Sequence, residues 1–371
     1  MKNVFVILCL IFLLPTLEAQ SDSEYLIKIG KPDSLYSKVL DENRKFWIQY
    51  PEFFNPNNKY PVLYVLDGSV HLPAVSNVHS YYSGGFMPEM IIVGVSNQTN
   101  RTRDLTATKV TFRRGVTYNQ ESGGADDFMQ FISSELIPYV ESKYPVTNYR
   151  TLIGHSYGGQ FVINALFNHT DLFQNYIAID PSLDWDNQVM LKQAKEVLKS
   201  KSFEGKSLFV TLAGQLHLQN NEITIDNVMK DTSEYTLFAR SNIAFSKLLE
   251  QYESNGLNSN WKFYPNDLHG TIILPSILDG LIFLFKWFPI EHTDKFNSPE
   301  TPNKELISII RAREAKLKKH FGYDVPPFDE SLFNMLGYMN MDMGQPDKAL
   351  SFFQLNIEYN PESANAYDSL A

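Results

Sequence analysis

The chain has 371 residues, of which 43% are hydrophobic and 13% aromatic, so it is neither disordered nor fibrous and has material for one large core plus a smaller appendage. Its formal net charge of −10 argues against a nucleic-acid partner, because phosphate binding needs clustered Lys and Arg side chains. The sequence contains no paired cysteines, no His-Glu-x-x-His motif, no P-loop and no dinucleotide fingerprint, so we expect no metal and no other cofactor.

The first predicted element is a secretory signal peptide at residues 1–19. Lys2 precedes an apolar run at residues 4–14, and the small residue Ala19 marks a cleavage site. The run is too short to span a bilayer, and no other stretch is long and apolar enough to be a membrane span. The single cysteine, Cys9, lies in this segment, so the mature chain is expected to lack disulfides. A lipid anchor on that cysteine is the competing interpretation, disfavoured by the leucine before it. We therefore predict a secreted or periplasmic protein.

Residues 25–290 alternate short β-branched or aromatic runs with helical stretches, which predicts an α/β domain with a mostly parallel sheet and helices on both faces. The expected strands are residues 45–50, 61–66, 90–95, 149–153, 176–179, 208–212 and 262–264. Several are continuous apolar runs, as strands buried on both faces should be. Between them, residues 125–143 carry apolar side chains at helical spacing. Active sites in such sheets lie beyond the carboxyl ends of the strands.

The C-terminal part has a different design. Residues 291–328 are predicted to form a polar linker and a charged helix at 304–320. Residues 329–371 then match the offsets of one tetratricopeptide repeat, a helical hairpin of about 34 residues, except that Asn340 stands where the pattern prefers Tyr. The matching positions are Phe333, Leu336, Gly337, Gly344, Ala349, Phe353 and Pro361. One repeat cannot bury its own apolar face, so we expect this segment to pack on the larger domain, to bind a protein partner, or to continue beyond Ala371.

The most informative motif is Gly-His-Ser-Tyr-Gly at residues 154–158. It follows the predicted strand at 149–153 and precedes a predicted helix at 160–167, which is the strand-turn-helix setting of a nucleophile elbow. In such a turn the serine hydroxyl is exposed at the top of a parallel sheet, and the flanking glycines permit the sharp backbone. Ser156 is therefore the candidate nucleophile, and the expected architecture is the α/β-hydrolase fold.

A serine hydroxyl is a weak nucleophile until a base takes its proton. Of the eight histidines, His269 lies between the last predicted strand and a helix that begins near Pro275, where this fold presents its base. The order of serine first and histidine last also agrees with the fold. We therefore predict His269 as the general base. His155, beside the serine, is expected to pack or hydrogen-bond locally and to border the substrate.

The third member of a triad is a carboxylate that orients the imidazole and stabilises its charged form. Glu222 and Asp226 follow the strand at 208–212, where we expect this acid, whereas Asp180 ends the preceding strand. Asp267, two residues before the base, is explained equally well as a solvated loop acid. We rank Glu222 first, with Asp226 and Asp180 behind it.

An oxyanion hole needs two preorganised N–H donors. One is expected from the residue after the nucleophile, Tyr157. The other should come from the turn that follows the strand at 61–66, where Gly68 lets the backbone approach a ligand. We favour the amide of Ser69, followed by that of Gly68.

Several segments together resemble the putative esterase family of α/β hydrolases, which includes enterochelin (siderophore) esterases, S-formylglutathione hydrolases, feruloyl esterases and mycolyltransferases. They are YPVLYVLDG at 60–68, IVGVSN at 92–97 with residues 101–105, ELIPY at 135–139, GHSYGG at 154–159 and IDPSL at 179–183. The resemblance spans residues 43–288 and implies Ser156 as nucleophile and His269 as base. Asp184 and Trp185 stand where such proteins often have paired tryptophans, and some siderophore esterases work with a serine-histidine pair alone.

Substrate contacts are expected from Trp185, which could stack on an aromatic acyl group, and from Arg101, which could receive an anionic substrate. The competing interpretations are core packing for the tryptophan and a structural ion pair for the arginine. Together the features predict a secreted serine esterase that cleaves a small-molecule carboxylic ester through an acyl-enzyme, with siderophore-type or aryl esters favoured by the resemblance. The alternatives are an acyltransferase with the same site and an inert hydrolase-fold protein whose helical tail recruits a protein partner.

Overall fold

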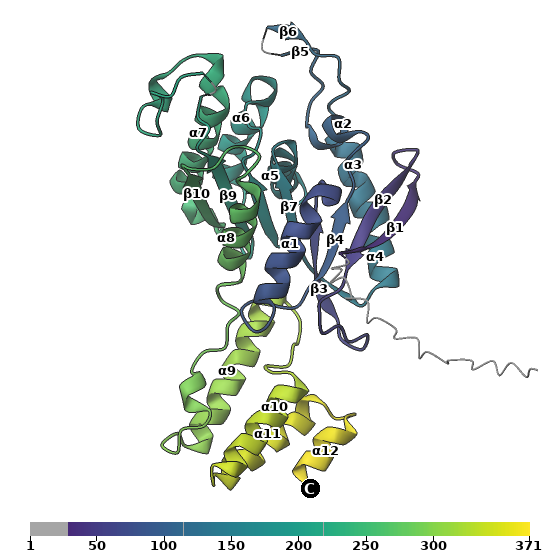
Figure 1. Ribbon diagram of the computed structural model, residues 1–371, viewed down its shortest axis with the longest axis vertical. Helices are drawn as coiled ribbons and strands as arrows, with labels where there is room; N and C mark the ends of the chain where they lie inside the picture. Colours follow the sequence, from purple (N-terminus) through teal and green to yellow (C-terminus); the bar gives the residue numbers. More distant parts are fainter. Residues whose placement is uncertain (1–28, 114, 218) are drawn as a thin grey trace, which may run out of the picture.

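The computed structural model describes residues 29–113, 115–217 and 219–371, so the predicted signal peptide lies outside the described residues. The centre of the described chain is an eight-stranded sheet with the order β1-β2-β4-β3-β7-β8-β9-β10 (Figure 1). β1 pairs with β2 and β2 with β4 in antiparallel fashion, whereas all pairs from β4 to β10 are parallel. This arrangement confirms the predicted α/β architecture with a mostly parallel sheet.

The seven predicted strands correspond to β2, β3, β4, β7, β8, β9 and β10. The bounds in the sheet are β1 (Lys31–Ser37), β2 (Glu42–Gln49), β3 (Tyr60–Val65), β4 (Ile91–Val95), β7 (Val146–His155), β8 (Asn175–Ile179), β9 (Ser207–Ala213) and β10 (Asn258–Tyr264). β3, β4 and β8 are buried at every position, which explains their continuous apolar runs. Away from the sheet, β5 (Phe112–Arg113) and β6 (Val116–Thr117) form a small antiparallel pair.

Helices cover both faces of the sheet, and each face has its own hydrophobic core. One core is shared by α3 (Ala125–Phe131), α4 (Ile137–Lys143), α5 (Tyr157–Asn168), α6 (Trp185–Ser200) and α7 (Leu237–Gln251). The other is shared by α1 (Gly68–Tyr82), α8 (Ile273–Phe285) and the end of α9 (Asn303–Phe321). Figure 1 shows α1 and α8 next to each other on one side of the strands. The short helix α2 (Arg101–Leu105) follows β4.

The predicted helix at 125–143 is continuous, but its middle is a π-helical turn, η1 (Ile132–Leu136), that joins α3 to α4. Pro138 lies in the first turn of α4. Proline has no N–H for the helix ladder, and its ring clashes with the carbonyl four residues earlier, so a wider turn before it relieves the clash. Short 3₁₀ turns complete the domain: η2 (Val228–Lys230), η3 (Glu234–Thr236), η4 (Glu253–Asn255) and η5 (Thr293–Lys295).

The predicted C-terminal helical segment is present as α10 (Glu330–Asp342), α11 (Pro346–Tyr359) and α12 (Ala364–Leu370), at the lower end of Figure 1. α10 and α11 form a hairpin in which Gly337 lies against Phe353; a Cβ at Gly337 would be 2.3 Å from Cε1 of that ring. Asn340, the departure from the repeat pattern, is buried, and its amide group donates to the side chain of Asn297 at 2.9 Å. The assignment of this C-terminal segment as a tetratricopeptide repeat stays a prediction.

Within the described ranges, every helix is too short or too polar to cross a bilayer.

Candidate active site

Ser156 occupies the sharp turn between β7 and α5, with φ 61° and ψ −116°. A Cβ at Gly154 would lie 2.3 Å from the carbonyl oxygen of Gly158, so the turn closes only with glycine there. The amide of Ser156 donates to the carbonyl of Ile179 at the end of β8, at 2.9 Å. The strand-turn-helix setting predicted for the motif is therefore present, with its serine fixed at the carboxyl end of the sheet.

Three neighbouring strands end in residues with unusual backbone conformations. Asp67 follows β3 with φ 52°, Ser156 follows β7 with φ 61°, and Asp180 follows β8 with φ 42°. The left-handed region costs a residue other than glycine about 1–2 kcal/mol, and such strain gathers at functional sites. Because β3, β7 and β8 are adjacent in the sheet, these three turns lie side by side.

His269 lies in the loop between β10 and α8, and its Nδ1 atom is 2.6 Å from Oδ2 of Asp180. The Asp180 side chain is 1% exposed, whereas that of His269 is 39% exposed. The second carboxylate oxygen of Asp180 accepts from the amide of Ala213 at 3.0 Å, and the Asp180 amide donates to Oγ1 of Thr211 at 3.2 Å. The carboxylate of Asp180 is thus held by the backbone amide of Ala213, and the Asp180 backbone is held by the hydroxyl of Thr211. The other carboxylate oxygen points at the imidazole, which leaves Nε2 of His269 for a reacting group.

The structure corrects the ranking of the triad acid, because Asp180 and not Glu222 contacts His269. Glu222 is exposed in the loop after β9, where its amide donates to the side chain of Asn220. Asp226, in the same loop, is also exposed. The segment after β9 therefore carries these two acids in solvent, while the acid at the end of β8 lies beside His269.

His155 is buried and packs against the base. Its ring centre is 4.5 Å from that of His269, and its Nε2 atom donates to the carbonyl oxygen of His269 at 2.9 Å. The ring of His71 lies edge-on to it at 5.8 Å. Burial, followed by the neighbouring His269 and His71, lowers the pKa of His155 to about 3, so the ring stays neutral. This contact ties the loop of His269 to the elbow, and a contact between His155 and substrate stays a prediction.

Arg101 joins the turn after β3 to the elbow. Its Nε and Nη2 atoms contact the carboxylate of Asp67 at 2.9–3.0 Å, and Nη2 also donates to the carbonyl of His155 at 3.1 Å. The guanidinium is therefore engaged in an ion pair, the structural alternative foreseen from sequence. A polar hollow of about 410 Å³ borders Arg101 and is lined by residues 98–103, 120 and 121. A contact between Arg101 and substrate stays a prediction.

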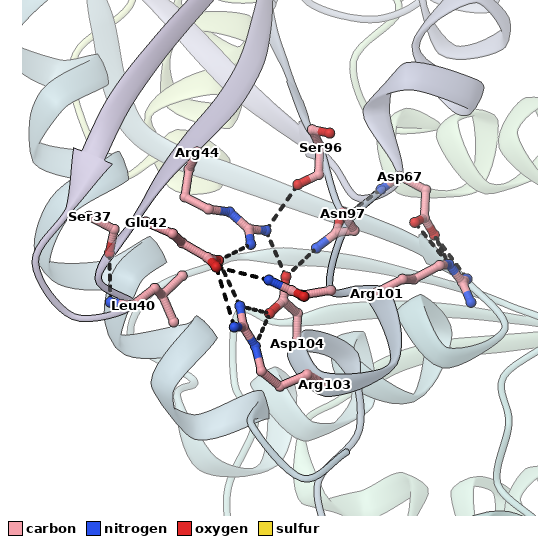
Figure 2. Close-up of polar contacts among 11 residues, drawn as sticks. Ser37, Leu40, Glu42, Arg44, Asp67, Ser96, Asn97, Arg101, Arg103 and Asp104 are labelled. Atoms are coloured by element: carbon pink, nitrogen blue, oxygen red, sulfur yellow. Dashed lines mark hydrogen bonds and ion pairs between the residues drawn. The ribbon is translucent and has the colours of Figure 1, made fainter. Parts of the chain in front are cut away.

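A buried polar network supports Asp67 from below (Figure 2). The Asp67 amide donates to Oδ1 of Asn97 at 3.1 Å, and Asn97 in turn reaches the carboxylate of Asp104 at 3.4 Å. Asp104 is fully buried and pairs with both Arg44 and Arg103 at 2.7 Å. Removing one partner from such a network leaves a buried charge uncompensated, which typically costs about 3–5 kcal/mol. The network therefore fixes the turn after β3.

The predicted oxyanion donors lie at two helix N-termini. Gly68 and Ser69 begin α1, and Tyr157 begins α5. The first amides of a helix have no acceptor within the helix, so they can donate to a ligand. The two turns lie close together, because a Cβ built at Gly158 would be 3.7 Å from the side chain of Leu66. Gly68 itself is packed against the backbone of β4, so of the two candidates in that turn Ser69 has the more open position.

Trp185 is fully buried, in contrast to the prediction that it contacts substrate. Its indole N–H donates to the carbonyl of Thr108 at 3.2 Å, and its ring packs edge-on against Tyr157 and Tyr118. The guanidinium of Arg113 lies 4.9 Å from the centre of the ring. The tryptophan is thus a packing residue beneath the first turn of α5. Sequence reasoning missed Ser182, whose hydroxyl is 3.2 Å from that of Ser156; its only signal was the Asp-Pro-Ser segment beside the candidate acid.

Comparison with known proteins decides the family. The family model described as Putative esterase matches residues 37–265, more than half of the chain. The chain belongs to this esterase family. It is 30% identical over 207 residues to the ferri-bacillibactin esterase BesA of Bacillus subtilis, a match that covers 50% of this chain and 71% of that protein. It is 31% identical over 176 residues to the siderophore enterobactin esterase of Emericella nidulans, covering 44% of this chain and little more than half, 56%, of that relative.

A solved structure extends the likeness beyond the family segment. The esterase resembles an IroE-like serine hydrolase from Shewanella oneidensis with a TM-score of 0.72 and 28% sequence identity, over 89% of this chain and 99% of that one. The shared part is longer than residues 37–265, which the family model matches. The structural likeness therefore includes residues outside the segment that the family model matches.

Proposed function

We propose that this esterase hydrolyses carboxylic esters through an acyl-enzyme formed on Ser156. The observation that carries the proposal is the 2.6 Å contact between His269 and the buried Asp180, next to a serine in a nucleophile elbow. A serine, a histidine and a buried carboxylate that follow parallel strands of one sheet are the parts of a catalytic triad for acyl transfer. Membership of the esterase family supports the same chemistry.

In the proposed reaction, Nε2 of His269 takes the proton of Ser156 as its Oγ attacks the ester carbonyl. The Nδ1 proton stays with His269 and is held by Asp180, which orients the ring and stabilises the imidazolium. His269 then returns the proton to the leaving alcohol, and a water molecule repeats the cycle to release the acid. The amides of Tyr157 and Ser69 would hold the oxyanion, since they lie in the first turns of two helices whose N-terminal ends are close together.

The substrate class is proposed from the relatives. BesA and the Emericella nidulans protein are named as esterases of ferri-bacillibactin and enterobactin, so we favour siderophore-type esters and, more broadly, esters with an aryl acyl group. The N-terminal pattern at residues 1–19 supports the proposal that the protein is exported and acts outside the cytoplasm. The polar hollow beside Arg101 is a candidate place for the anionic or catechol groups of such a substrate.

The test combines a fluorophosphonate probe with a panel of short-chain, feruloyl and catecholate-siderophore esters. The wild-type chain should label and turn over at least one ester, whereas Ser156→Ala should not label and His269→Ala should lose at least about 1,000-fold in kcat. Ser142→Ala and His292→Ala, at exposed positions, are matched controls and should behave as wild type. A folded wild-type protein that neither labels nor turns over any ester would contradict the proposal.

A further inference from the structure

The hydroxyl of Ser182 is the hydrogen-bonding partner of the proposed nucleophile. Ser182 is 3% exposed and lies in the turn between β8 and α6, and its Oγ is 3.2 Å from Oγ of Ser156. We infer that Ser182 is a further catalytic residue, whose hydroxyl donates to Ser156 Oγ and stabilises the negative charge that develops there. This inference rests on the proposed function of Ser156.

The side chain of Ser182 has no other hydrogen bond among the described residues. Its backbone amide already bonds the carbonyl of Ser156 at 3.0 Å, and the preceding carbonyl, of Pro181, accepts from the side chain of Asn242 at 2.9 Å. These contacts fix the turn through the backbone and would remain with alanine at position 182. A buried hydroxyl carries a desolvation cost unless it is bonded, so the contact that offsets this cost is the one with the nucleophile.

The direction of this hydrogen bond follows from the proton balance of the reaction. The proton of Ser156 must go to Nε2 of His269, so once it leaves, Ser182 is the partner that still carries a proton. Ser182 keeps its proton throughout, and no covalent bond to it forms or breaks. Hydrogen bonds to charged oxygens are stronger than those to neutral ones, so the contact strengthens as charge develops on Ser156 Oγ.

Charge develops on that oxygen twice in the cycle. It appears when Ser156 attacks the ester, and again when Ser156 leaves the acyl group during deacylation. Between the two steps the oxygen belongs to an ester and is a weaker acceptor. The Ser182 hydroxyl therefore binds the transition states more strongly than the ground states, which is the condition for a rate effect.

The opposite direction predicts the opposite result. If Ser156 donated to Ser182, the contact would hold the nucleophile's proton away from His269, and removal of the Ser182 hydroxyl would accelerate the reaction. A slower Ser182→Ala variant therefore indicates that Ser182 donates to Ser156, and a faster one indicates that Ser156 donates to Ser182.

The experiment uses the full chain with Ser182→Ala, Ser182→Thr and the control Ser246→Ala, which removes a hydroxyl of similar burial in α7 that bonds the carbonyl of Ile243. Fluorophosphonate labelling rates, and kcat and KM for 4-nitrophenyl acetate, are measured from pH 5 to 9. We expect Ser182→Ala to lower the labelling rate and kcat about tenfold with KM unchanged, and Ser182→Thr to restore most of the loss. Ser246→Ala should match wild type.

The pH profile distinguishes direct action from a structural role. Loss of a donor to Ser156 lowers the rate at every pH without moving the apparent pKa of the base, whereas a displaced His269 would move it. A Ser182→Ala variant that is as fast as wild type, faster, or shifted in apparent pKa would overturn the inference while the proposed function stands. If the wild-type protein fails to label, Ser156 is not a reactive nucleophile, and both the proposed function and this inference are wrong.

Discussion

Asp180 and Glu222 are two of the three carboxylates ranked for the role of triad acid, and their environments differ sharply. Asp180 is buried against His269 and the amide of Ala213, whereas Glu222 is exposed. In Asp180→Asn the amide would face Nδ1 as a donor and favour the wrong tautomer of the base, so kcat should fall by about 1,000- to 10,000-fold. Glu222→Gln, the matched control, should keep wild-type kcat. Equal losses in the two variants, or a loss only in Glu222→Gln, would contradict the geometry.

The sequence offers one candidate nucleophile and one candidate base, but it leaves three candidate acids. Ser156 carries a local motif, and His269 follows from its place after the last strand. The pairing of Asp180 with His269 joins residues 89 positions apart and depends on how the ends of β8, β9 and β10 align in the sheet. The alignment of strand ends in space has no signature in a single sequence, so Glu222, Asp226 and Asp180 are all candidates at that level.

At the scale of elements, the strands buried on both faces were predictable, whereas the polar edge strand β1 was not. β3, β4 and β8 are continuous apolar runs, but β1 has a mostly exposed or half-buried sequence, and its pairing with β2 at the sheet edge holds it in place. The π-helical turn before Pro138 was likewise missed, because periodicity describes the helix as a whole and not its internal hydrogen bonds. The burial of Trp185 also depends on distant partners, so its packing could not be separated from a rim position.

The hairpin of α10 and α11 depends on the close approach at Gly337. Alanine is the better helix former by about 1 kcal/mol, but its methyl group would lie 2.3 Å from the ring of Phe353 and force the helices apart, at about 1–3 kcal/mol. Gly337→Ala should therefore increase hydrogen exchange in α10 and α11, with peptides from β3 as the unchanged internal control. Combining it with Phe353→Leu, which makes room, should cost less than the sum of the single changes. Slower exchange in Gly337→Ala would contradict this packing.

At the scale of the whole molecule, α9 links the tail, formed by α10, α11 and α12, to the sheet domain. Leu317 and Phe321, near its end, belong to the core beneath α1 and α8, whereas Leu306 and Ile310, near its start, pack with the tail helices. Arg313 lies between these two pairs of residues. It donates to the carbonyl of residue 288, before α9, and to that of residue 327, after α9. One helix thus contributes to two cores and joins the C-terminal helices to the sheet domain through packed side chains.

The stability of the whole fold should fall in mild acid because of buried histidines, of which His79 in α1 is the clearest. Its Nε2 atom accepts from the amide of Met90, just before β4, at 3.0 Å, and burial lowers its pKa to about 4. Protonation would break that bond, so between pH 6.5 and 4 the unfolded chain binds the proton and the folded chain does not. Stability therefore rises with pH in this window, and lowering the pH from 7 to 5 should remove about 2 kcal/mol through His79 alone.

Urea unfolding at pH 7 and pH 5 tests this linkage. His79→Gln offers the amide of Met90 a carbonyl oxygen that does not titrate, so the variant should lose about 2 kcal/mol less than wild type between the two pH values, even if it is less stable at both. Because each variant is compared with itself at the two pH values, a loss of stability that is the same at both pH values cancels. His292→Asn, at an exposed linker position with left-handed backbone, should keep the wild-type difference. If His79→Gln loses as much stability as wild type on acidification, the acid sensitivity of the fold lies in other groups, such as the buried His155 beside the base.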